Sequence, residues 1–377
     1  MGRELFYKAL LFSKEFKALL RIPFRFFRLK SIVEKPSYYP ELPRKSKAER
    51  WIDNIYWLFH DRLQNNYYTS YGLDVKGFRD KRDYLPQHRF INTRNAGNQK
   101  LKLTISGDYN YIVLLRDKYV FSAYLASVIG PQYVIESVGI VDRGRLFLKK
   151  ENRWTEAGAL IEMPGQWVFK VIDGECGEGI YLVTIAAGRF CVGGKTLTME
   201  EFSGQILRNA RWLIQPVVKQ HPALEAFGTR SVNTIRAVTI RGKSGKISVF
   251  NAFLRLGADK ESFVDNRAMG GLGVGIELES GKLMKYGFQH DHFGGKTEVH
   301  PLSGIVFEGY QIPFWQEALA LIENAHRQFY EMQSIGWDVV ITENGPVLLE
   351  GNDDWEIGGP QDTYGGLKQR WIDQINA

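Results

Sequence analysis

Two acids and one amide stand at matched ends of two neighbouring apolar runs in the stretch IGWDVVITENGPVLLEGN, residues 335–352. Glu350 and Asn352 are two residues apart, so on a strand their side chains share one face. If Asp338 on the preceding run faces them, the three oxygens suit a magnesium ion that bridges nucleotide phosphates. The alternative is three exposed polar residues at strand ends. The flanking runs are those of a buried sheet, where polar groups need partners, and this favours the metal site.

The turn between these two runs decides whether Asp338 faces Glu350. A two-residue Asn344–Gly345 turn would pair Asp338 with Gly351 and point its side chain to the opposite face. A three-residue loop over 343–345, with its glycine left-handed in a bulge, pairs Asp338 directly with Glu350. We therefore predict the three-residue loop, which makes all three oxygens converge.

A strand that delivers a lysine runs into a glycine-rich loop in the stretch GQWVFKVIDGECGEGIYLV. Lys170 lies near the end of this strand, Gly174, Gly177 and Gly179 follow it, and a second strand leaves the loop. Glycines let backbone N–H groups approach phosphate oxygens, and the lysine supplies a point charge. A β-hairpin with a flexible tip explains the pattern equally well. Because a strand follows the glycines, neither a Walker loop nor a dinucleotide fingerprint is indicated.

Two further stretches offer nucleotide contacts. Asp117 and Lys118 begin a predicted helix after the apolar run YIVLL, and Lys118 is either a phosphate ligand or a solvated surface lysine. In WLIQPVVKQH, Gln215 could meet an adenine edge and the backbone of Val218 could hydrogen-bond to it, although a plain buried strand fits as well. His290 and His292 could bind a metal, but exposed histidines at a strand end are the simpler interpretation.

The elements that must position these groups form an α+β pattern. Turn pairs such as GKSG and ESGK join neighbouring apolar runs without helices between them, which predicts largely antiparallel sheets. Helices are predicted near 31–65, 200–211 and 313–334. The predicted divisions are a basic helical N-terminal extension over 1–60, an N-terminal lobe over 61–115, a subdomain with the glycine-rich loop over 116–212, and a subdomain with the metal-binding hairpin over 213–377.

Charge is concentrated at the N-terminus of the chain. Residues 1–50 contain 13 Lys and Arg against 5 Glu, a net +8, so the other 327 residues sum to about −1 of the total +7. This argues against a nucleic-acid protein. Leu5, Ala9, Phe12, Phe16 and Leu19 recur at helical spacing among lysines, and Pro23 is expected to end this helix. The basic amphipathic helix either packs on the body of the protein or docks on an anionic membrane face or an acidic partner.

The two cysteines, Cys176 and Cys191, support neither a disulfide framework nor a zinc site, which favours a reducing cytoplasmic compartment. Lysines interrupt each apolar stretch of the N-terminus, so we expect no signal peptide and no membrane-spanning segment there.

These positions, in this order, resemble the ATP-grasp superfamily. The stretches SVNTIRAVTIR, VDNRAMGG and IGWDVVITENGPVLLEGN are similar to its sugar-transfer associated branch over about residues 105–355. The resemblance implies a fold of two α+β lobes that grip ATP and two magnesium ions. It assigns the nucleotide to Lys118, Lys170, Gly174, Gly177, Gly179, Gln215, Val218 and Asn233, and the metals to Asp338, Glu350 and Asn352.

The same resemblance implies which residues face the reacting groups. Arg236 would stabilise the transferred phosphoryl group together with Lys170. Asp265, Asn266, Arg267 and the Gly270–Gly271 pair match a loop that faces the acceptor. The chain departs from the family pattern at Pro216, which removes one hinge N–H, and in having only Gln220 and His221 where an acidic ribose ligand is expected.

The resemblance implies a carboxylate-amine ligase that forms an amide through an acyl phosphate, on a sugar acid or polysaccharide precursor in capsule or surface-glycan synthesis. Tyr67, Tyr68 and Tyr71 could stack on sugars. A sugar kinase-like phosphotransferase or a non-catalytic nucleotide-binding protein are the alternatives. We expect a cytoplasmic enzyme with a glycan carboxylate and an amine as partners, and the N-terminal helix as a possible contact with the inner membrane face or a glycan-assembly protein.

Overall fold

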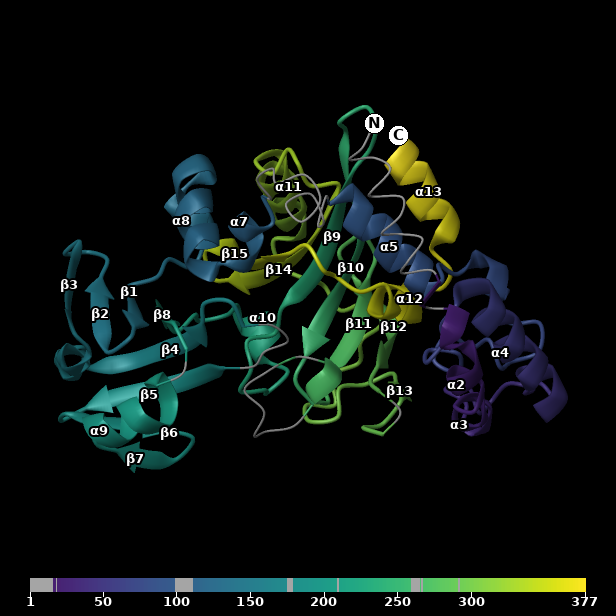
Figure 1. The fold of residues 1–377 in the computed structure, drawn as a ribbon, viewed down its shortest axis with the longest axis horizontal. Helices are drawn as coiled ribbons and strands as arrows, with labels where there is room; N and C mark the ends of the chain where they lie inside the picture. The colour runs from purple at the N-terminus through teal and green to yellow at the C-terminus, as the bar shows by residue number, and fades with distance from the viewer. Residues whose placement is uncertain are drawn as a thin grey trace.

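The computed structural model describes residues 16–17, 19–98, 111–174, 179–208, 210–258, 265, 267–290 and 292–377. Two separate β-sheets dominate these residues, and Figure 1 shows them side by side, with the helices of the N-terminal segment at the far end of the second sheet. All strand pairs within both sheets are antiparallel, as the sequence predicted.

The first sheet has eight strands in the order β3-β2-β1-β8-β4-β5-β6-β7. Its strands are β1 Gly139–Asp142, β2 Arg145–Leu148, β3 Arg153–Glu156, β4 Gly165–Val171, β5 Ile180–Ala186, β6 Arg189–Val192, β7 Lys195–Leu197 and β8 Trp212–Pro216. One face packs into a core around Phe169, Phe190 and Phe202. Strand β8 crosses the division expected at 212/213, because its backbone pairs with β1 and β4 of this sheet.

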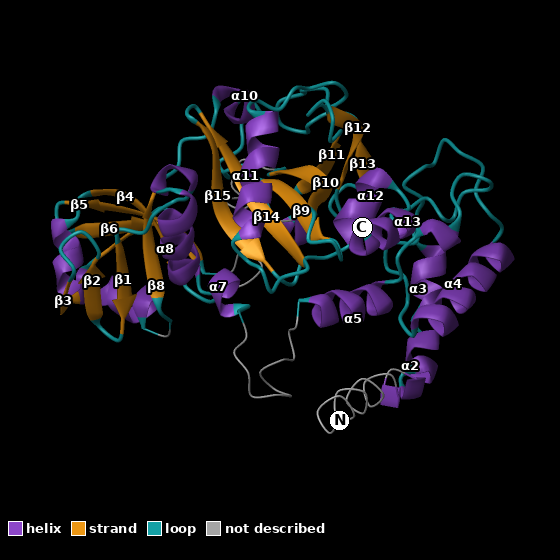
Figure 2. Ribbon diagram, turned by 90° about the horizontal axis from the view of Figure 1, so that it is seen from above, coloured by secondary structure: helices purple, strands orange, loops and turns teal. Residues whose placement is uncertain are grey.

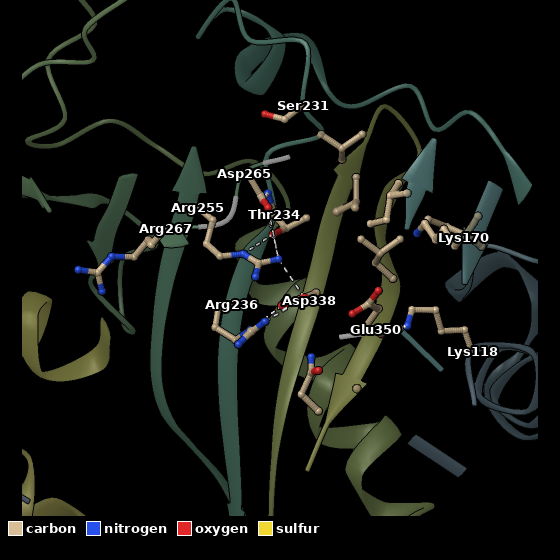
Figure 3. A pocket seen from close by; sticks show the side chains of 18 of the residues that line it. Lys118, Lys170, Ser231, Thr234, Arg236, Arg255, Asp265, Arg267, Asp338 and Glu350 are labelled. Atoms are coloured by element: carbon tan, nitrogen blue, oxygen red, sulfur yellow. Dashed lines mark hydrogen bonds and ion pairs between the residues drawn. The ribbon is translucent and has the colours of Figure 1, made fainter. Parts of the chain in front are cut away.

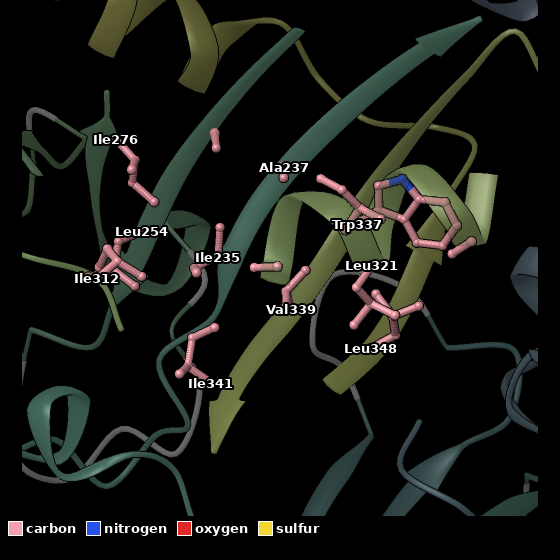
Figure 4. Close-up of a cluster of buried hydrophobic side chains, with 14 of the residues drawn as sticks. Ile235, Ala237, Leu254, Ile276, Ile312, Leu321, Trp337, Val339, Ile341 and Leu348 are labelled. Atoms are coloured by element: carbon pink, nitrogen blue, oxygen red, sulfur yellow. The ribbon is translucent and has the colours of Figure 1, made fainter. Parts of the chain in front are cut away.

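The second sheet has seven strands in the order β13-β12-β11-β10-β9-β14-β15. Its strands are β9 Ile235–Arg241, β10 Ile247–Leu256, β11 Leu272–Ile276, β12 Leu283–Phe288, β13 Lys296–Thr297, β14 Ser334–Thr342 and β15 Gly345–Asn352. Helix α11 (Trp315–Arg327) covers one face and builds the largest core with it, as Figure 4 shows around Trp337 and Leu348. The opposite face of β9, β10, β14 and β15 carries the polar groups considered below.

In the hairpin of β14 and β15, Asp338 pairs with Glu350 as predicted, but the cause differs from the predicted one. Thr342 pairs with Gly345, so the turn has two residues, Glu343 and Asn344, and the predicted three-residue loop is wrong. A register shift then follows, because Val339 pairs with Leu348 whereas Asp338 pairs with Glu350. The extra residue that brings Asp338 opposite Glu350 therefore lies in a bulge within β15 rather than in the turn.

The other helices cluster at the N-terminus or pack against the sheets (Figures 1 and 2). They are α2 Ile22–Phe26, α3 Leu29–Glu34, α4 Lys47–Asp61, α5 Gln87–Gly97, α7 Val113–Arg116, α8 Lys118–Ile129, α9 Met199–Phe202, α10 Pro222–Glu225, α12 Gly358–Tyr364 and α13 Lys368–Asn376, with short 3-10 turns η1 Lys81–Asp83, η2 Pro131–Tyr133, η3 Ala157–Glu162 and η5 Arg267–Met269 and the π turn η4 Ser203–Leu207. Of these helices, α9 packs against the first sheet, and α12 and α13 pack against the second. In the described part of the chain, none of the helices combines the length and hydropathy needed to cross a bilayer.

The structure adds local detail to three of the predictions. The helical residues 16–17 and 19–20 are followed by a turn at Arg21, so that helix ends just before Pro23 as expected, and Pro23 stands in the first turn of the next helix, α2, where its missing N–H costs nothing. The apolar run before Asp117 forms α7 rather than a strand, and Asp117 itself caps α8 by accepting from the N–H groups of Tyr119 and Val120, both at 3.0 Å. The predicted N-terminal lobe contains the helix α5, which the sequence did not signal because it has little amphipathic pattern.

Candidate functional site

A cavity of about 1140 Å³ lies between the two sheets, and both sheets contribute to its walls. The first sheet and α8 provide Lys118, Lys170 and Gly174, while β9, β10, β14 and β15 provide Arg236, Arg255, Asp338, Glu350 and Asn352. Figure 3 shows Lys118 and Lys170 on one side of the cavity and the paired side chains of Arg236, Arg255 and Asp338 on the other. Glu350 lies between these two groups. Segments more than 150 residues apart in sequence therefore meet in one cavity.

Lys170 brings a positive charge into a nearly dry environment. Its side chain, on β4, is 6% exposed, and burial lowers its pKa while the nearby Glu350 carboxylate opposes that change. Lys118, at the start of α8, donates from Nζ to the carbonyl of Gly174 and so ties the helix to the glycine-rich loop. The two predicted phosphate-binding lysines thus lie together with the first part of the loop between them.

One end of the cavity is apolar. Ile135, Val168, Pro216, Val218 and Leu349 line it, so walls from both sheets could enclose a flat base. Gln215 also lines this end, but its amide Nε2 donates to the carbonyl of Ile135 at 2.6 Å. That bond fixes the side chain and leaves its oxygen as the group able to face a ligand.

The β14 carboxylate is held by two arginines from neighbouring strands. Arg236 on β9 is directly opposite Asp338 and contacts it through Nε at 2.5 Å and Nη2 at 3.0 Å. Arg255 on β10 adds a third contact, Nη2 to Oδ2 at 2.9 Å. Burial alone would raise the pKa of Asp338, but the two guanidinium groups outweigh it and the pKa is lowered. Asp338 is therefore ionised and carries its charge toward the cavity.

Arg255 was not anticipated from the sequence and is the centre of this network. Besides Asp338, it contacts the hydroxyl of Thr234 at 2.7 Å and lies 3.5 Å from Asp265. Asp265 in turn accepts from the N–H and hydroxyl of Thr234, at 2.9 and 2.6 Å. Burial disfavours the charged arginine, yet Asp265, Asp338 and Glu350 together raise its pKa. Arg255 is a single charged residue inside the apolar run NAFLRL, and this pattern, which identified Asp338, could also have marked Arg255 as a site residue.

Glu350 and Asn352 have spare capacity for a ligand. Among the described residues no hydrogen bond is found for the Glu350 carboxylate, and the Asn352 amide nitrogen is buried without a partner. Their pairing opposite Asp338 and Gly336 puts all three predicted metal-binding side chains on one face. The donor set, with two carboxylates and an amide, fits magnesium. Within the described ranges, no cluster of three or more His, Cys, Asp or Glu forms a metal site.

The other end of the cavity is polar and its charges are matched. Arg116 binds Asp353 at 2.7 Å, and the buried Arg94 of α5 binds Asp354. All four of these side chains line the cavity, although the sequence had not singled them out. The segment that follows β15 thus forms a wall next to the metal face.

Arg267 and Tyr67 close this end. Arg267 donates to the fully buried Asp362 at 2.6 Å, while its Nε is buried without a partner among the described residues. Tyr67 lines the cavity and is hydrogen-bonded to Glu356, and its burial raises its pKa. Tyr68 and Tyr71 do not reach the cavity, because they are almost fully buried in the N-terminal core.

Several predicted site residues lie elsewhere. Asn233 is fully buried, donates to the carbonyl of Leu224 at 3.0 Å and does not line the cavity. Gly179 and Gly270 have positive φ values of 67° and 96° and shape loops behind the walls. Gly177 and Asn266 lie outside the described residues. His290 lines the cavity, and its ring lies 5.9 Å from that of His292.

One missed acid lies on the apolar side of the cavity. Glu225, the last residue of α10, lines the cavity together with Val218 and Gln220. The sequence had indicated no acidic ribose ligand after Val218, because Glu225 is five residues beyond Gln220 and reaches the cavity only through the short helix α10.

A family model described as "Sugar-transfer associated ATP-grasp" matches residues 101–376 of this chain. A comparison with curated proteins gives no match.

Solved structures with similarity include D-alanyl-alanine synthetase A from Vibrio cholerae O1 biovar eltor (12% identity, 75% of this chain and 68% of that chain, TM-score 0.39). A biotin carboxylase complex from Campylobacter jejuni follows with 10% identity, 71% and 48% coverage and a TM-score of 0.40. An ADP complex of N5-carboxyaminoimidazole ribonucleotide synthetase has 9% identity, 65% and 46% coverage and a TM-score of 0.37, so the chain spans less than half of that protein.

Proposed function

Because the chain belongs to the sugar-transfer associated ATP-grasp family, we propose that it is an ATP-dependent ligase that joins a carboxylate to an amine. The fold is the ATP-grasp fold, with two α+β lobes and the cavity between them. The observation that carries the proposal is the convergence of Lys118, Lys170 and the face of Asp338, Glu350 and Asn352 on this one cavity. Such a set neutralises phosphate charge at two positions at once.

In the proposed reaction, a carboxylate oxygen of the first substrate attacks the γ-phosphorus of ATP and the bond to the β-phosphate oxygen breaks. The products are an acyl phosphate and ADP. The nitrogen of the second substrate then attacks the acyl carbon, inorganic phosphate leaves with the bonding electron pair, and the nitrogen loses a proton. No protein nucleophile is needed, since positioning and charge neutralisation supply most of the catalysis.

The residues divide this work between the two lobes. Lys118 and Lys170 bind phosphate oxygens from the side of the first sheet, and the apolar end around Val218 holds the base. Glu350 and Asn352, with Asp338, would hold magnesium, which when bound supplies Lewis-acid stabilisation of the phosphate charge. Arg236 and Arg255 stand beside Asp338, where they stabilise negative charge that develops on the transferred group.

The polar end of the cavity would receive the carboxylate substrate. Arg267 presents an unpartnered buried Nε, and Tyr67 and Phe253 offer aromatic surface next to it. A cation beside aromatic faces suits a sugar acid, because its carboxylate pairs with the guanidinium and its ring packs on the aromatic groups. We therefore propose a sugar acid or a glycan precursor as the carboxylate substrate, and an amino acid or small amine as the second, in surface-glycan synthesis.

The test is a screen for ADP and phosphate release with magnesium-ATP, uronic acids or their nucleotide sugars, and common amines. A ligase releases phosphate only when the acid and the amine are both present. A phosphotransferase would form ADP with a single acceptor and release no phosphate, and a non-catalytic binding protein would bind magnesium-ATP with no turnover on any pair. Either result would sink the proposal.

A further inference from the structure

The first described segment of the chain exposes apolar side chains at high density. Phe24 and Phe27 are 76% and 82% exposed, and the segment over 16–27 also exposes Phe16, Leu19, Leu20 and Phe26. Its other apolar residue near α2, Ile22, packs inward against the N-terminal core. Six exposed large apolar side chains within twelve residues are unusual on a folded protein, and exposed apolar groups at this density favour an interaction site.

Helix α4 adds a second exposed apolar row beside this segment. Ile52, Tyr56 and Phe59 are 65%, 42% and 55% exposed, and their spacing of four and three residues puts them on one face. The opposite face of α4 is buried through Trp57 and Leu58. The ring of Phe26 lies 6.1 Å from that of Trp51, so α2 and α4 are in contact.

The charge of the segment over 16–33 has one sign, although the exposed Glu49 at the start of α4 lies nearby. Between Phe16 and Val33 the sequence has five basic residues, Lys17, Arg21, Arg25, Arg28 and Lys30, and the first acid is Glu34. Arg25 is anchored to the carbonyl of Arg62, whereas Arg21 and Arg28 are exposed. An acidic protein partner would satisfy the charges but gives no reason for so many exposed aliphatic and aromatic groups. A bilayer with anionic headgroups satisfies both, because rings enter the acyl boundary and cations stay among the headgroups.

We propose that residues 16–17 and 19–30 and the exposed face of α4, here called the N-terminal surface, dock on an anionic lipid bilayer. Docking does not depend on the ligase reaction. It also has a consequence for the cavity: Tyr67, which lines the cavity, packs in the same core cluster as Leu29, Ile32 and Leu58 beneath the surface. The Tyr67 end of the cavity is therefore held in a fixed relation to the docked surface.

The experiment is co-sedimentation of the full chain with vesicles of phosphatidylcholine, with and without phosphatidylglycerol. We expect binding to the anionic vesicles that weakens with added salt. The variant Phe24→Ser/Phe27→Ser should reduce the partition coefficient at least about tenfold, because two large apolar side chains leave the acyl boundary. The variant Arg21→Gln/Arg28→Gln should reduce it by about fivefold for each charge removed.

A matched control removes one exposed apolar and one exposed basic residue at the opposite end of the molecule, where Figure 1 shows the β1–β3 strands. Ile161→Ser/Arg143→Asn changes groups exposed by 45% and 91%, and Asn tolerates the positive φ of 48° at that turn. Its binding should equal that of the unchanged protein. Equal binding to both vesicle types, or no binding, would overturn the proposal. So would self-association without vesicles that Phe24→Ser/Phe27→Ser abolishes, since this would assign the surface to a second copy of the chain.

Discussion

The two faces of the second sheet differ in their polar groups: those on one face are neutral and hydrogen-bonded, whereas those on the other are charged and partly without partners. On the face covered by α11, apolar side chains surround one neutral hydrogen-bond chain: Trp337 donates to the Thr239 hydroxyl at 2.8 Å, and that hydroxyl lies 2.6 Å from Nδ1 of His326 (Figure 4 shows Trp337 in this core). The other imidazole nitrogen, Nε2, lies 3.0 Å from the carbonyl of Met332. The side-chain polar groups of Trp337, Thr239 and His326 are thus all hydrogen-bonded, and we infer that these hydrogen bonds stabilise the fold.

The cavity face, in contrast, is charged and incompletely partnered. Arg236, Arg255 and Asp338 satisfy one another, but Glu350 and Asn352 on the adjacent strand retain groups with no described partner. Glu350 is half-buried, so water can reach its carboxylate, whereas the amide nitrogen of Asn352 is buried without a described partner. Under the proposed function, phosphate and magnesium would be the partners of these two side chains. The comparison therefore separates the residues that hold the sheet together from those that the proposed ligand would contact.

The largest effect on stability is expected from removing Arg255, because the buried carboxylates of Asp265 and Asp338 both pair with it. Arg255→Met leaves Asp265 and one side of Asp338 without a cation in a buried environment, which commonly costs about 3–5 kcal/mol of unfolding free energy. Chemical denaturation measures it. Arg153→Met is the control, because it removes a surface partner of Glu151, and its cost should stay within about 1 kcal/mol. Equal costs for the two variants would show that the Arg255 network does not hold the sheet together.

Glu350→Gln should have the opposite effect: it should lower the reaction rate and leave the stability almost unchanged. It removes a carboxylate that has no described partner, so the unfolding free energy should change little, whereas the rate should fall ~10²–10³-fold, about 3–4 kcal/mol. The measurement is ADP release by the proposed reaction, with magnesium-ATP affinity as a second readout. Glu343→Gln, in the turn of the same hairpin, is the matched control and should keep full activity. Full activity of Glu350→Gln would refute the metal assignment.

His326 should make the core face sensitive to acid. Burial lowers its pKa to about 4 from an ordinary value of 6.5. The unfolded chain therefore takes up the proton first, so stability is complete above pH 6.5 and is lost as the pH falls toward 4, by about 3 kcal/mol in all. Unfolding free energies measured across this range should show the loss. The variant His326→Gln should have a correspondingly flatter profile, and an equally steep one would contradict the assignment.

A smaller effect is expected from the hydroxyl at the centre of the neutral chain. Thr239→Val leaves Trp337 Nε1 and His326 Nδ1 unpartnered in the core, which should cost about 1–3 kcal/mol. Thr239→Ser keeps the hydroxyl and should cost less. Neither variant should alter magnesium-ATP affinity, because the side chain lies on the face away from the cavity. A change in affinity without a change in stability would break the distinction between the two faces.

The shared face of Glu350 and Asn352 was predictable, because strand alternation alone decides it. Asp338 was found as a polar residue in an apolar run, but its position opposite Glu350 depends on the bulge in β15 rather than on the predicted loop. Lys118 and Lys170 line the same cavity, and their part in phosphate binding stays a prediction from the family resemblance. Asn233 does not line the cavity, because it lies in the loop two residues before β9 and its amide donates to the carbonyl of Leu224.

The sequence determined the antiparallel α+β pattern, the polar positions of the hairpin and the one-sided basic charge of the N-terminus, because these depend on local periodicity and composition. Only the tertiary structure decided the rest. The bulge in β15 rather than the turn sets the pairing of Asp338 with Glu350, because a register shift depends on how both strands pack. Arg255, Arg94 and Arg116 reach the cavity through contacts between distant segments. No local pattern specifies such contacts, because the chain must fold before these charges can meet.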